Sequence, residues 1–403
     1  MNREENMISP DKYWVSVGRN MNDIINDDDK VTIKWSGNLS DDYIIMGDAF
    51  YNTARLIITT ILDDYRDNEK CDEWFFPALY LYRQGIELLC KGLFIAVTSK
   101  KDITPKFKTY KHNIIEFFNE YMSKSTEVAI SANELEWLRK YLTDLEKYDK
   151  SSNLFRYPIK DGILSEYNNS FLDIVDMANS IDQCYAIMYK CVVQKFDPQK
   201  YAVDIDLTMK PEVLFFASHG IGNCMLYESP WDAGYRKHLE GYSNIAHFLL
   251  KKLDKNHLSF LIIAFLMRHS IELGLKNILV SRTEYCVDVK IQFSKKWKHS
   301  IYKDLWLTVK DMVEHYSEKN SYDLSVIDLG DQYLNELSKY DNKGDRFRYP
   351  TNNGLEYHLN KKAFDFYESI YWLISVFNFV NGCADMLDQA YEYECDMRSE
   401  YMF

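Results

Sequence analysis

The chain has 403 residues, of which 46% are hydrophobic, and it contains only 15 Gly and 8 Pro. This composition can bury substantial cores in about two or three domains, and it excludes a chain that is disordered as a whole. The 61 acidic residues outnumber the 48 basic residues, and the net charge of −13 repels a phosphate backbone, which excludes non-specific coating of DNA.

The first half of the chain is predicted to contain one short strand followed by helices. Val31, Ile33 and Trp35 alternate with polar residues, which predicts the strand. Apolar residues at helical spacing then predict helices over residues 41–64, 74–98, 112–124, 133–147 and 170–193.

A linker and a second helical half are predicted to follow. Residues 196–232 hold three prolines and two glycines, a density typical of a linker. Within it, alternating apolar residues over 203–209 predict a second strand, and the apolar residues 213–216 indicate that the linker packs against a domain. The helices expected after the linker span residues 235–253, 258–282, 299–316, 324–339 and 361–390.

The two halves carry the same motifs in the same order. Glu87, Lys91, Lys111-His112, Asp149 and Phe155-Arg156-Tyr157-Pro158 recur as Glu272, Lys276, Lys298-His299, Asp341 and Phe347-Arg348-Tyr349-Pro350. The offsets are 272 − 87 = 185 at the first motif and 347 − 155 = 192 at the last, so the copies differ by a few loop residues. A repeat this long indicates two duplicated domains.

We therefore predict a mainly α fold of two tandem antiparallel helical bundles with short flanking β-strands. The expected ranges are an N-terminal strand and extension (1–39), a first helical domain (40–195), a linker with a strand (196–234) and a second helical domain (235–403). Matching patches of the two copies should face each other across a pseudo-twofold axis, which would make the chain an intrachain pseudo-dimer that can associate further.

Three charged side chains recur at a spacing of four residues on one apolar helix of each copy. They are Arg83, Glu87 and Lys91 in the first copy, and Arg268, Glu272 and Lys276 in the second. Charges on so apolar a helix need partners, because isolated buried charge is costly. The repeated candidates for these partners are His112, Asp149 and Arg156, and their counterparts His299, Asp341 and Arg348.

Two interpretations of these charges stay open at this point. In the first they form a structural ion network that fixes how helices and loops dock. In the second they form an anion site, where Arg156 and Arg348 offer bidentate donors to phosphate and His112 and His299 exchange protons. Such a site has the groups needed to cleave RNA through its own 2′-hydroxyl without a metal ion.

The ordered motifs resemble those of the HEPN superfamily, in which a helix with E-x-x-x-K is followed by a Lys/Thr-His helix start and an R-Y-P element. The resemblance implies all-α bundles that dimerise, often with metal-independent ribonuclease activity in bacterial toxin–antitoxin and anti-phage systems. The nucleases of that family carry an Arg followed by a His about four to six residues later. No arginine of this chain has a histidine at that spacing: Arg268 and His269 are adjacent, and Arg236 and His238 are two residues apart.

Two functions are therefore expected as alternatives. One is an endoribonuclease that cleaves RNA at a cleft between the two copies, with Arg156 and Arg348 on phosphate and with His112, His269 and His299 as candidates for proton transfer. Arg268, next to His269, is a further candidate catalytic residue. The other is a catalytically silent module that binds a ligand or a protein partner of a defence system. Because the first copy has Arg83-Gln84 where the second has Arg268-His269, we expect only one of the two faces to be active.

Other features predict a cytoplasmic protein without metal or cofactor. The eight cysteines include no CxxC pair, which indicates reduced thiols. The N-terminus lacks the layout of a signal peptide, and the most apolar run, residues 258–267, is far shorter than the ~20 residues of a membrane span. No HExxH motif, paired Cys/His motif or Walker loop is present.

Overall fold

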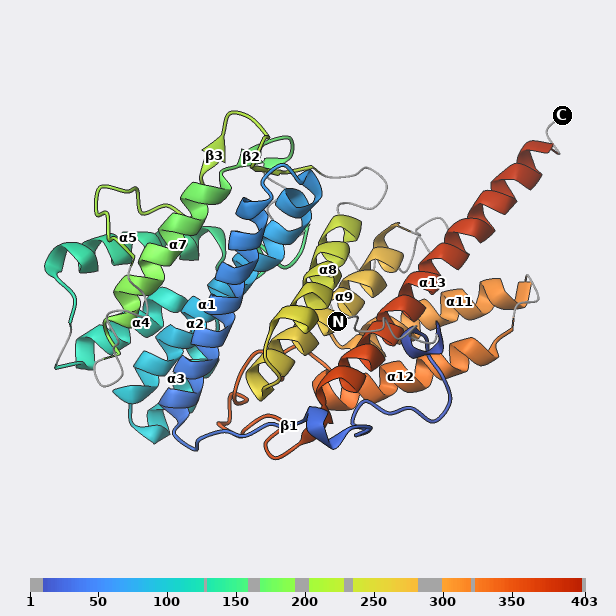
Figure 1. Cartoon of the computed structure of the whole chain (residues 1–403), viewed down its shortest axis with the longest axis horizontal. Helices are drawn as coiled ribbons and strands as arrows, with labels where there is room; N and C mark the ends of the chain where they lie inside the picture. The colour runs from blue at the N-terminus through green and yellow to red at the C-terminus, as the bar shows by residue number, and fades with distance from the viewer. Residues whose placement is uncertain are drawn as a thin grey trace, which may run out of the picture. The chain divides into compact units, whose positions relative to one another are not determined.

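The computed structural model describes residues 10–126, 129–158, 167–192, 203–227, 235–281, 299–319 and 323–400. Helices dominate these ranges and strands are few and short, so the predicted mainly α fold is confirmed (Figure 1). The chain divides into two compact units. The first-copy unit comprises Lys34–Ile245 and Arg348–Asn360, and the second-copy unit comprises Met1–Ile33, Ala246–Phe347 and Lys361–Phe403.

Each unit thus collects segments that are distant in sequence. The expected ranges 40–195 and 235–403 treat the domains as consecutive blocks. In the structure, the N-terminal segment Met1–Ile33 groups with the second copy, and Arg348–Asn360 of the second copy groups with the first. This exchange of short segments is not visible in the hydrophobic pattern, because the pattern reports local periodicity and not long-range packing.

The first-copy unit is built around helix α2 (Phe75–Ala96), whose residues from Phe75 to Ile95 are all buried. The other helices of this unit are α1 (Leu39–Asp63), α3 (Lys100–Tyr110), α4 (Ile114–Lys124), α5 (Ala132–Tyr148) and α7 (Ile174–Tyr189), together with the π-helical turn η3 (Lys70–Trp74) and the first part of α8 (Tyr235–Lys252). A Cβ at Gly92 of α2 would lie 2.6 Å from the side chain of Ile44, so α1 and α2 approach each other closely. The Ser40 hydroxyl donates a 2.8 Å hydrogen bond to the Gly92 carbonyl at the same crossing.

A three-stranded sheet attaches the linker to the first copy. Strand β2 (Phe171–Leu172) lies between β3 (Phe216–Ala217) and β4 (Cys224–Met225), and both pairings are antiparallel. The prediction that the linker packs against a domain is therefore confirmed at these strands. The predicted strand over 203–209 is wrong: the Asp206 carboxylate accepts hydrogen bonds from the Thr208 backbone N–H (2.9 Å) and hydroxyl (2.6 Å), which makes a turn there.

The second-copy unit holds the strand predicted at the N-terminus. Strand β1 (Lys30–Thr32) pairs antiparallel with β5 (Ala363–Asp365) and ends before Trp35. The helical elements of this unit are η1 (Pro10–Tyr13), η2 (Asp27–Asp29), α9 (His257–Ser281), the π-helical turn η4 (Ile301–Trp306), α11 (Leu307–Lys319), α12 (Ser325–Asp341) and α13 (Phe366–Glu400). The N-terminal segment is tied to α12 and α13: Met21 N–H donates to the Glu336 carboxylate at 2.8 Å, and the Ser369 hydroxyl donates to the Met21 carbonyl at 2.6 Å.

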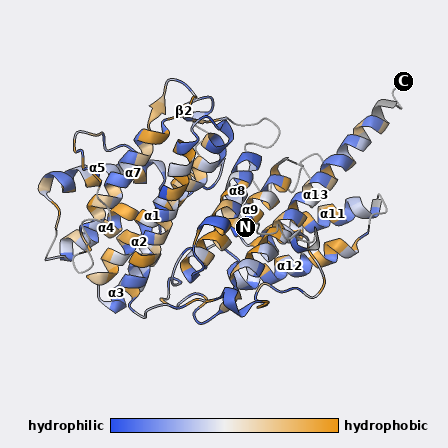
Figure 2. Cartoon of the chain, viewed as in Figure 1, coloured by the Kyte–Doolittle hydropathy of each residue, from blue (hydrophilic) through white to orange (hydrophobic). Residues whose placement is uncertain are grey.

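Among the residues that the structure describes, two helices are long and apolar enough to cross a membrane by length and composition, His257–Val280 and Phe366–Met397. Of the apolar window in His257–Val280, 94% is buried inside the protein, which confirms the prediction of a buried helix. Figure 2 shows hydrophobic residues along α2 and α9, whereas the C-terminal end of α13 is largely hydrophilic. Neither helix is a clear membrane span.

Candidate functional site

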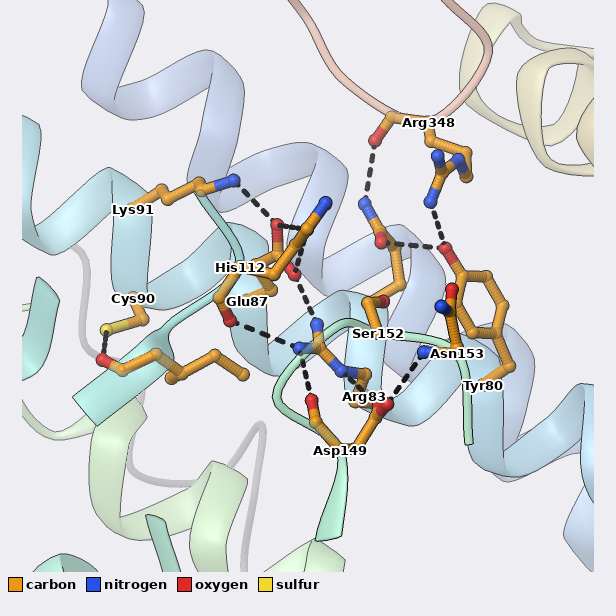
Figure 3. Close-up of polar contacts among 12 residues, drawn as sticks. Tyr80, Arg83, Glu87, Cys90, Lys91, His112, Asp149, Ser152, Asn153 and Arg348 are labelled. Carbon is orange, nitrogen blue, oxygen red and sulfur yellow. Dashed lines mark hydrogen bonds and ion pairs between the residues drawn. The ribbon is translucent and has the colours of Figure 1, made fainter. Parts of the chain in front are cut away.

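The predicted charged residues of the first copy meet in one cluster, which we call the first ionic cluster: Arg83, Glu87, Lys91, His112 and Asp149 (Figure 3). Arg83 donates from Nη1 to the Glu87 carboxylate and from Nε to Asp149 Oδ2 at 2.6 Å. Lys91 Nζ donates to Glu87 Oε1 at 2.6 Å, and His112 Nδ1 lies 3.2 Å from the same oxygen. Helix α2 places three of these side chains on one stripe, as their spacing predicts.

The other two members reach the cluster from loops at helix ends. His112 precedes α4, whose N-cap is Asn113, and the preceding Lys111 turns the chain with a positive φ of 53°. Asp149 is the C-cap of α5, and its Oδ1 accepts the backbone N–H groups of Asn153 and Leu154 at 2.7 and 2.9 Å. Arg83 Nη2 also donates to the His112 carbonyl at 3.2 Å, so a single guanidinium fixes both loops.

The second-copy unit contains the same arrangement, the second ionic cluster: Arg268, Glu272, Lys276, His299 and Asp341. Arg268 donates to the Glu272 carboxylate and, at 3.3 Å, to the His299 carbonyl. Lys276 Nζ and His299 Nδ1 lie 2.6 and 3.1 Å from Glu272 Oε1. Around Glu87 and Glu272 the same residue types make matching contacts, which is the structural counterpart of the sequence repeat.

The two clusters differ in the group that accepts from the arginine Nε. Arg268 Nε donates to the backbone carbonyl of Asp341 at 3.2 Å, whereas Arg83 Nε donates to the Asp149 carboxylate. Gly344, at the position that matches Ser152, lies against the Arg268 guanidinium, and a Cβ there would be 3.0 Å from Arg268 Nη1. Both loop residues adopt a positive φ, 61° at Ser152 and 76° at Gly344.

The charges in the first cluster balance one another while they are buried. Arg83, Glu87 and Asp149 are at most 3% exposed and Lys91 is 6% exposed, so two cations face two carboxylates away from water. Burial opposes ionisation of Glu87, but the charges of Lys91 and Arg83 and the hydrogen bond with His112 hold the pKa of Glu87 well below its usual range. In the second cluster, Lys276, Arg268 and His299 do the same to the pKa of Glu272 against its burial.

The two histidines are the partly exposed members of the clusters, with side chains that are 31% and 38% accessible for His112 and His299. Burial lowers the pKa of His112, and the Glu87 charge offsets only part of that effect, which favours the neutral ring. When Nδ1–H donates to Glu87, the other nitrogen, Nε2, is left as an acceptor. In Figure 3 that nitrogen points away from Glu87.

The two arginines expected on phosphate are buried instead, at 8% exposure for Arg156 and 4% for Arg348. Arg156 donates to the Ser152 carbonyl at 2.7 Å and to Asn153 Oδ1 at 2.8 Å. Arg348 donates to the Tyr80 hydroxyl at 2.5 Å, and both guanidinium groups lie over the Tyr80 ring, 5.5 and 6.0 Å from its centre. This arrangement does not present either arginine to a phosphate in solvent.

The contacts of Tyr349 and Gln84 were not foreseen from the sequence. The Tyr349 hydroxyl donates to Glu87 Oε1 at 2.7 Å and lies 3.4 Å from His112 Nδ1. Gln84 donates to the Arg348 carbonyl at 3.0 Å and accepts from the Tyr80 hydroxyl at 3.0 Å. The repeated Arg-Tyr-Pro motif singles out Tyr349 but not Gln84, and no local pattern shows which helix the motif packs against.

His269, the other candidate for proton transfer, lies inside the protein. It is 1% exposed and its ring stacks on Phe265 with centres 5.7 Å apart, so it is not presented to solvent. Arg268 is fully buried in the cluster. Lys298, the neighbour of His299 in the sequence motif, lies outside the described residues.

Within the described ranges, no group of three or more His, Cys, Asp or Glu residues is placed to hold a metal ion. Seven cysteines in those ranges are free thiols, and six of them are buried.

Comparison of the chain with protein-family models, with curated proteins and with solved structures gives no significant match.

Proposed function

We propose that this chain is a tandem HEPN-like helical module of a bacterial defence or stress system, and that it acts by holding a ligand or a protein partner and not by cutting RNA. The observation that carries this proposal is the burial of balanced charge in the first ionic cluster. Arg83 and Lys91 are already matched by Glu87 and Asp149, so the cluster offers no excess positive charge to a phosphate. The missing Arg-to-His spacing supports the same conclusion.

The charge of the whole chain also supports a protein or small ligand over a nucleic acid. A net charge of −13 repels RNA unless basic side chains gather on one face. Arg156 and Arg348, which could have formed such a face, are buried against Tyr80. A partner with a basic surface fits this charge better.

One observation favours a second candidate, a metal-independent endoribonuclease acting in the cytoplasm. Each copy holds a carboxylate and histidine pair, Glu87 with His112 and Glu272 with His299, and each histidine is partly exposed. A carboxylate that orients an imidazole in this way is a common feature of general bases. Such a nuclease would still need a cation near the scissile phosphate.

An RNA cleavage assay separates the two candidates. Purified full-length wild type, the double variant His112→Ala with His299→Ala, and the control His315→Ala, whose side chain is exposed outside both clusters, are incubated with total RNA and transfer RNA in EDTA. The binding proposal predicts intact RNA in all three samples, also when expression of the wild type arrests growth. Cleavage by the wild type and His315→Ala, with intact RNA in the double variant, would overturn it in favour of the nuclease.

A further inference from the structure

The second-copy unit contains a pocket of about 290 Å³, and none of the residues that line it belongs to the ionic clusters. Its walls come from the end of α11, the start of α12, the middle of α13 and the N-terminal segment. The apolar side chains that line it are Trp14, Val313, Val326, Ile327, Phe379 and Met386. A volume of this size is close to the lower end of small-molecule sites, which span roughly 300–1,000 Å³.

Two glycines position the aromatic walls of the pocket. A Cβ at Gly382 would lie 2.9 Å from the Trp14 indole, and a Cβ at Gly330 would lie 2.0 Å from the Phe379 ring. Each ring therefore rests directly on a helix backbone, where a larger residue would push it away. The two rings form walls that exist before any ligand arrives.

Three side chains that line the pocket carry a polar group: Ser317, Cys383 and Asp323. The Ser317 hydroxyl is directed to the sulfur of Met386 at 3.4 Å, and burial raises the pKa of the Cys383 thiol to about 12, so it stays uncharged. Asp323 is the one charged side chain among the described residues that line the pocket. Hydrogen bonds from the Ser325 backbone N–H and hydroxyl, at 2.8 and 2.7 Å, lower the pKa of Asp323 and keep it ionised.

We propose that this pocket binds a compact aromatic amine, with its ring between Trp14 and Phe379 and its ammonium group at Asp323. The apolar lining favours a ring over a polar ligand, because burying an unpaired polar group is costly. The lone carboxylate selects a cation by charge complementarity. The volume admits one ring with a short side chain, since a cavity of about 150 Å³ already holds benzene. This inference goes beyond the proposed function and does not depend on whether the chain cleaves RNA.

The test uses 2-phenylethylamine as the cationic probe and 3-phenylpropionate as its anionic counterpart, with binding to the full chain measured by calorimetry at neutral pH. We expect the amine to bind at least fivefold more tightly than the acid. Asp323→Asn should weaken amine binding about fivefold, as expected for one ion pair at an exposed carboxylate, because Asn keeps the cap to Ser325 but loses the charge. The matched control Asp328→Asn, an exposed residue in the first turn of α12, should leave the affinity unchanged.

A second variant fills the pocket. Val326→Phe should abolish binding of the amine, whereas Val17→Phe, at a residue that is 83% exposed, should not. If Val326→Phe does not fold, the two aspartate variants still decide the question. Absence of amine binding to the wild type, equal binding of the acid, or unchanged binding to Asp323→Asn would each overturn the proposal.

Discussion

The hydroxyl of Tyr349 donates a 2.7 Å hydrogen bond to Glu87, a residue 262 positions earlier in the chain. Glu87 is fully buried and also accepts from Arg83 and Lys91, so a side chain from the second copy completes the charged core of the first. The Lys91 ammonium lies 4.7 Å from the centre of the Tyr349 ring, which adds a cation–π contact at the same place. The segment Arg348–Asn360 thus belongs to the first-copy unit, and its Tyr349 side chain contacts the ionic cluster of that unit.

We predict that Tyr349→Phe lowers the free energy of unfolding by about 2 kcal/mol, because a buried hydrogen bond to a charged group is lost while the ring is kept. Urea denaturation of the wild type and the variant measures this change. Tyr393→Phe, at a side chain that is 61% exposed, is the control and should shift the free energy by less than about 0.5 kcal/mol. Equal effects of the two substitutions would show that the contact to Glu87 contributes nothing.

Ser152→Gly should stabilise the protein by about 1 kcal/mol. Ser152 adopts a φ of 61°, a left-handed conformation that glycine adopts without strain, and the second copy has Gly344 with a φ of 76° at this place. Among the residues that the structure describes, the buried hydroxyl of Ser152 has no hydrogen-bond partner, so the substitution removes no hydrogen bond. Thermal unfolding measures the gain. The neighbouring Ser151→Gly, which lacks the positive φ, should lower stability instead, and stabilisation by both variants would argue against relief of strain.

The pH dependence of stability should depend on Glu146. One carboxylate oxygen of Glu146 is buried and accepts no hydrogen bond from any described residue, and burial raises its pKa from 4.5 to about 7. Since the folded state binds this proton more tightly than the unfolded state, stability is highest below about pH 4.5 and is lost as the pH rises to about 7. Glu146→Gln removes that loss.

We therefore expect Glu146→Gln to gain about 1 kcal/mol over the wild type at pH 8, and little at pH 4.5, in urea denaturation at the two pH values. The control is Glu136→Gln on the same helix. Glu136 is exposed and its hydrogen bond with Lys140 lowers its pKa, so this substitution should give no gain at pH 8. A gain for Glu146→Gln that is the same at both pH values would exclude titration of this carboxylate as its cause.

The sequence predicts the helices and the members of each ionic cluster well, because both depend on local spacing. The stripe Arg83, Glu87 and Lys91 follows from the helical period alone, and α5 begins where Ser131 and Glu134 form a capping box. Helix α3 was missed because Pro105 lies inside it and its sequence is strongly polar.

The predictions that failed or fell short depend on long-range packing. The predicted helix over 361–390 begins only at Phe366, because residues Ala363–Asp365 pair with β1 at the other end of the chain. The placement of Arg348 on Tyr80 also depends on a contact between residues far apart in the chain. An arginine that binds phosphate and one that packs on a tyrosine look identical in a sequence. The burial of Arg348, which only the structure gives, separates a phosphate-binding arginine from one that packs on a tyrosine.

We infer that the two ionic clusters hold the fold together, because their opposite charges are paired while buried, and the variants Glu87→Gln and Glu272→Gln test this role most directly. Each substitution leaves two buried cations with one carboxylate fewer, so the account predicts a loss of about 3–5 kcal/mol in the free energy of unfolding for each. The control Glu116→Gln, at an exposed residue of α4, should change it by less than about 0.5 kcal/mol. Urea denaturation that shows unchanged or increased stability in both cluster variants would contradict the claim, because that result is typical of charges kept for function at the expense of stability.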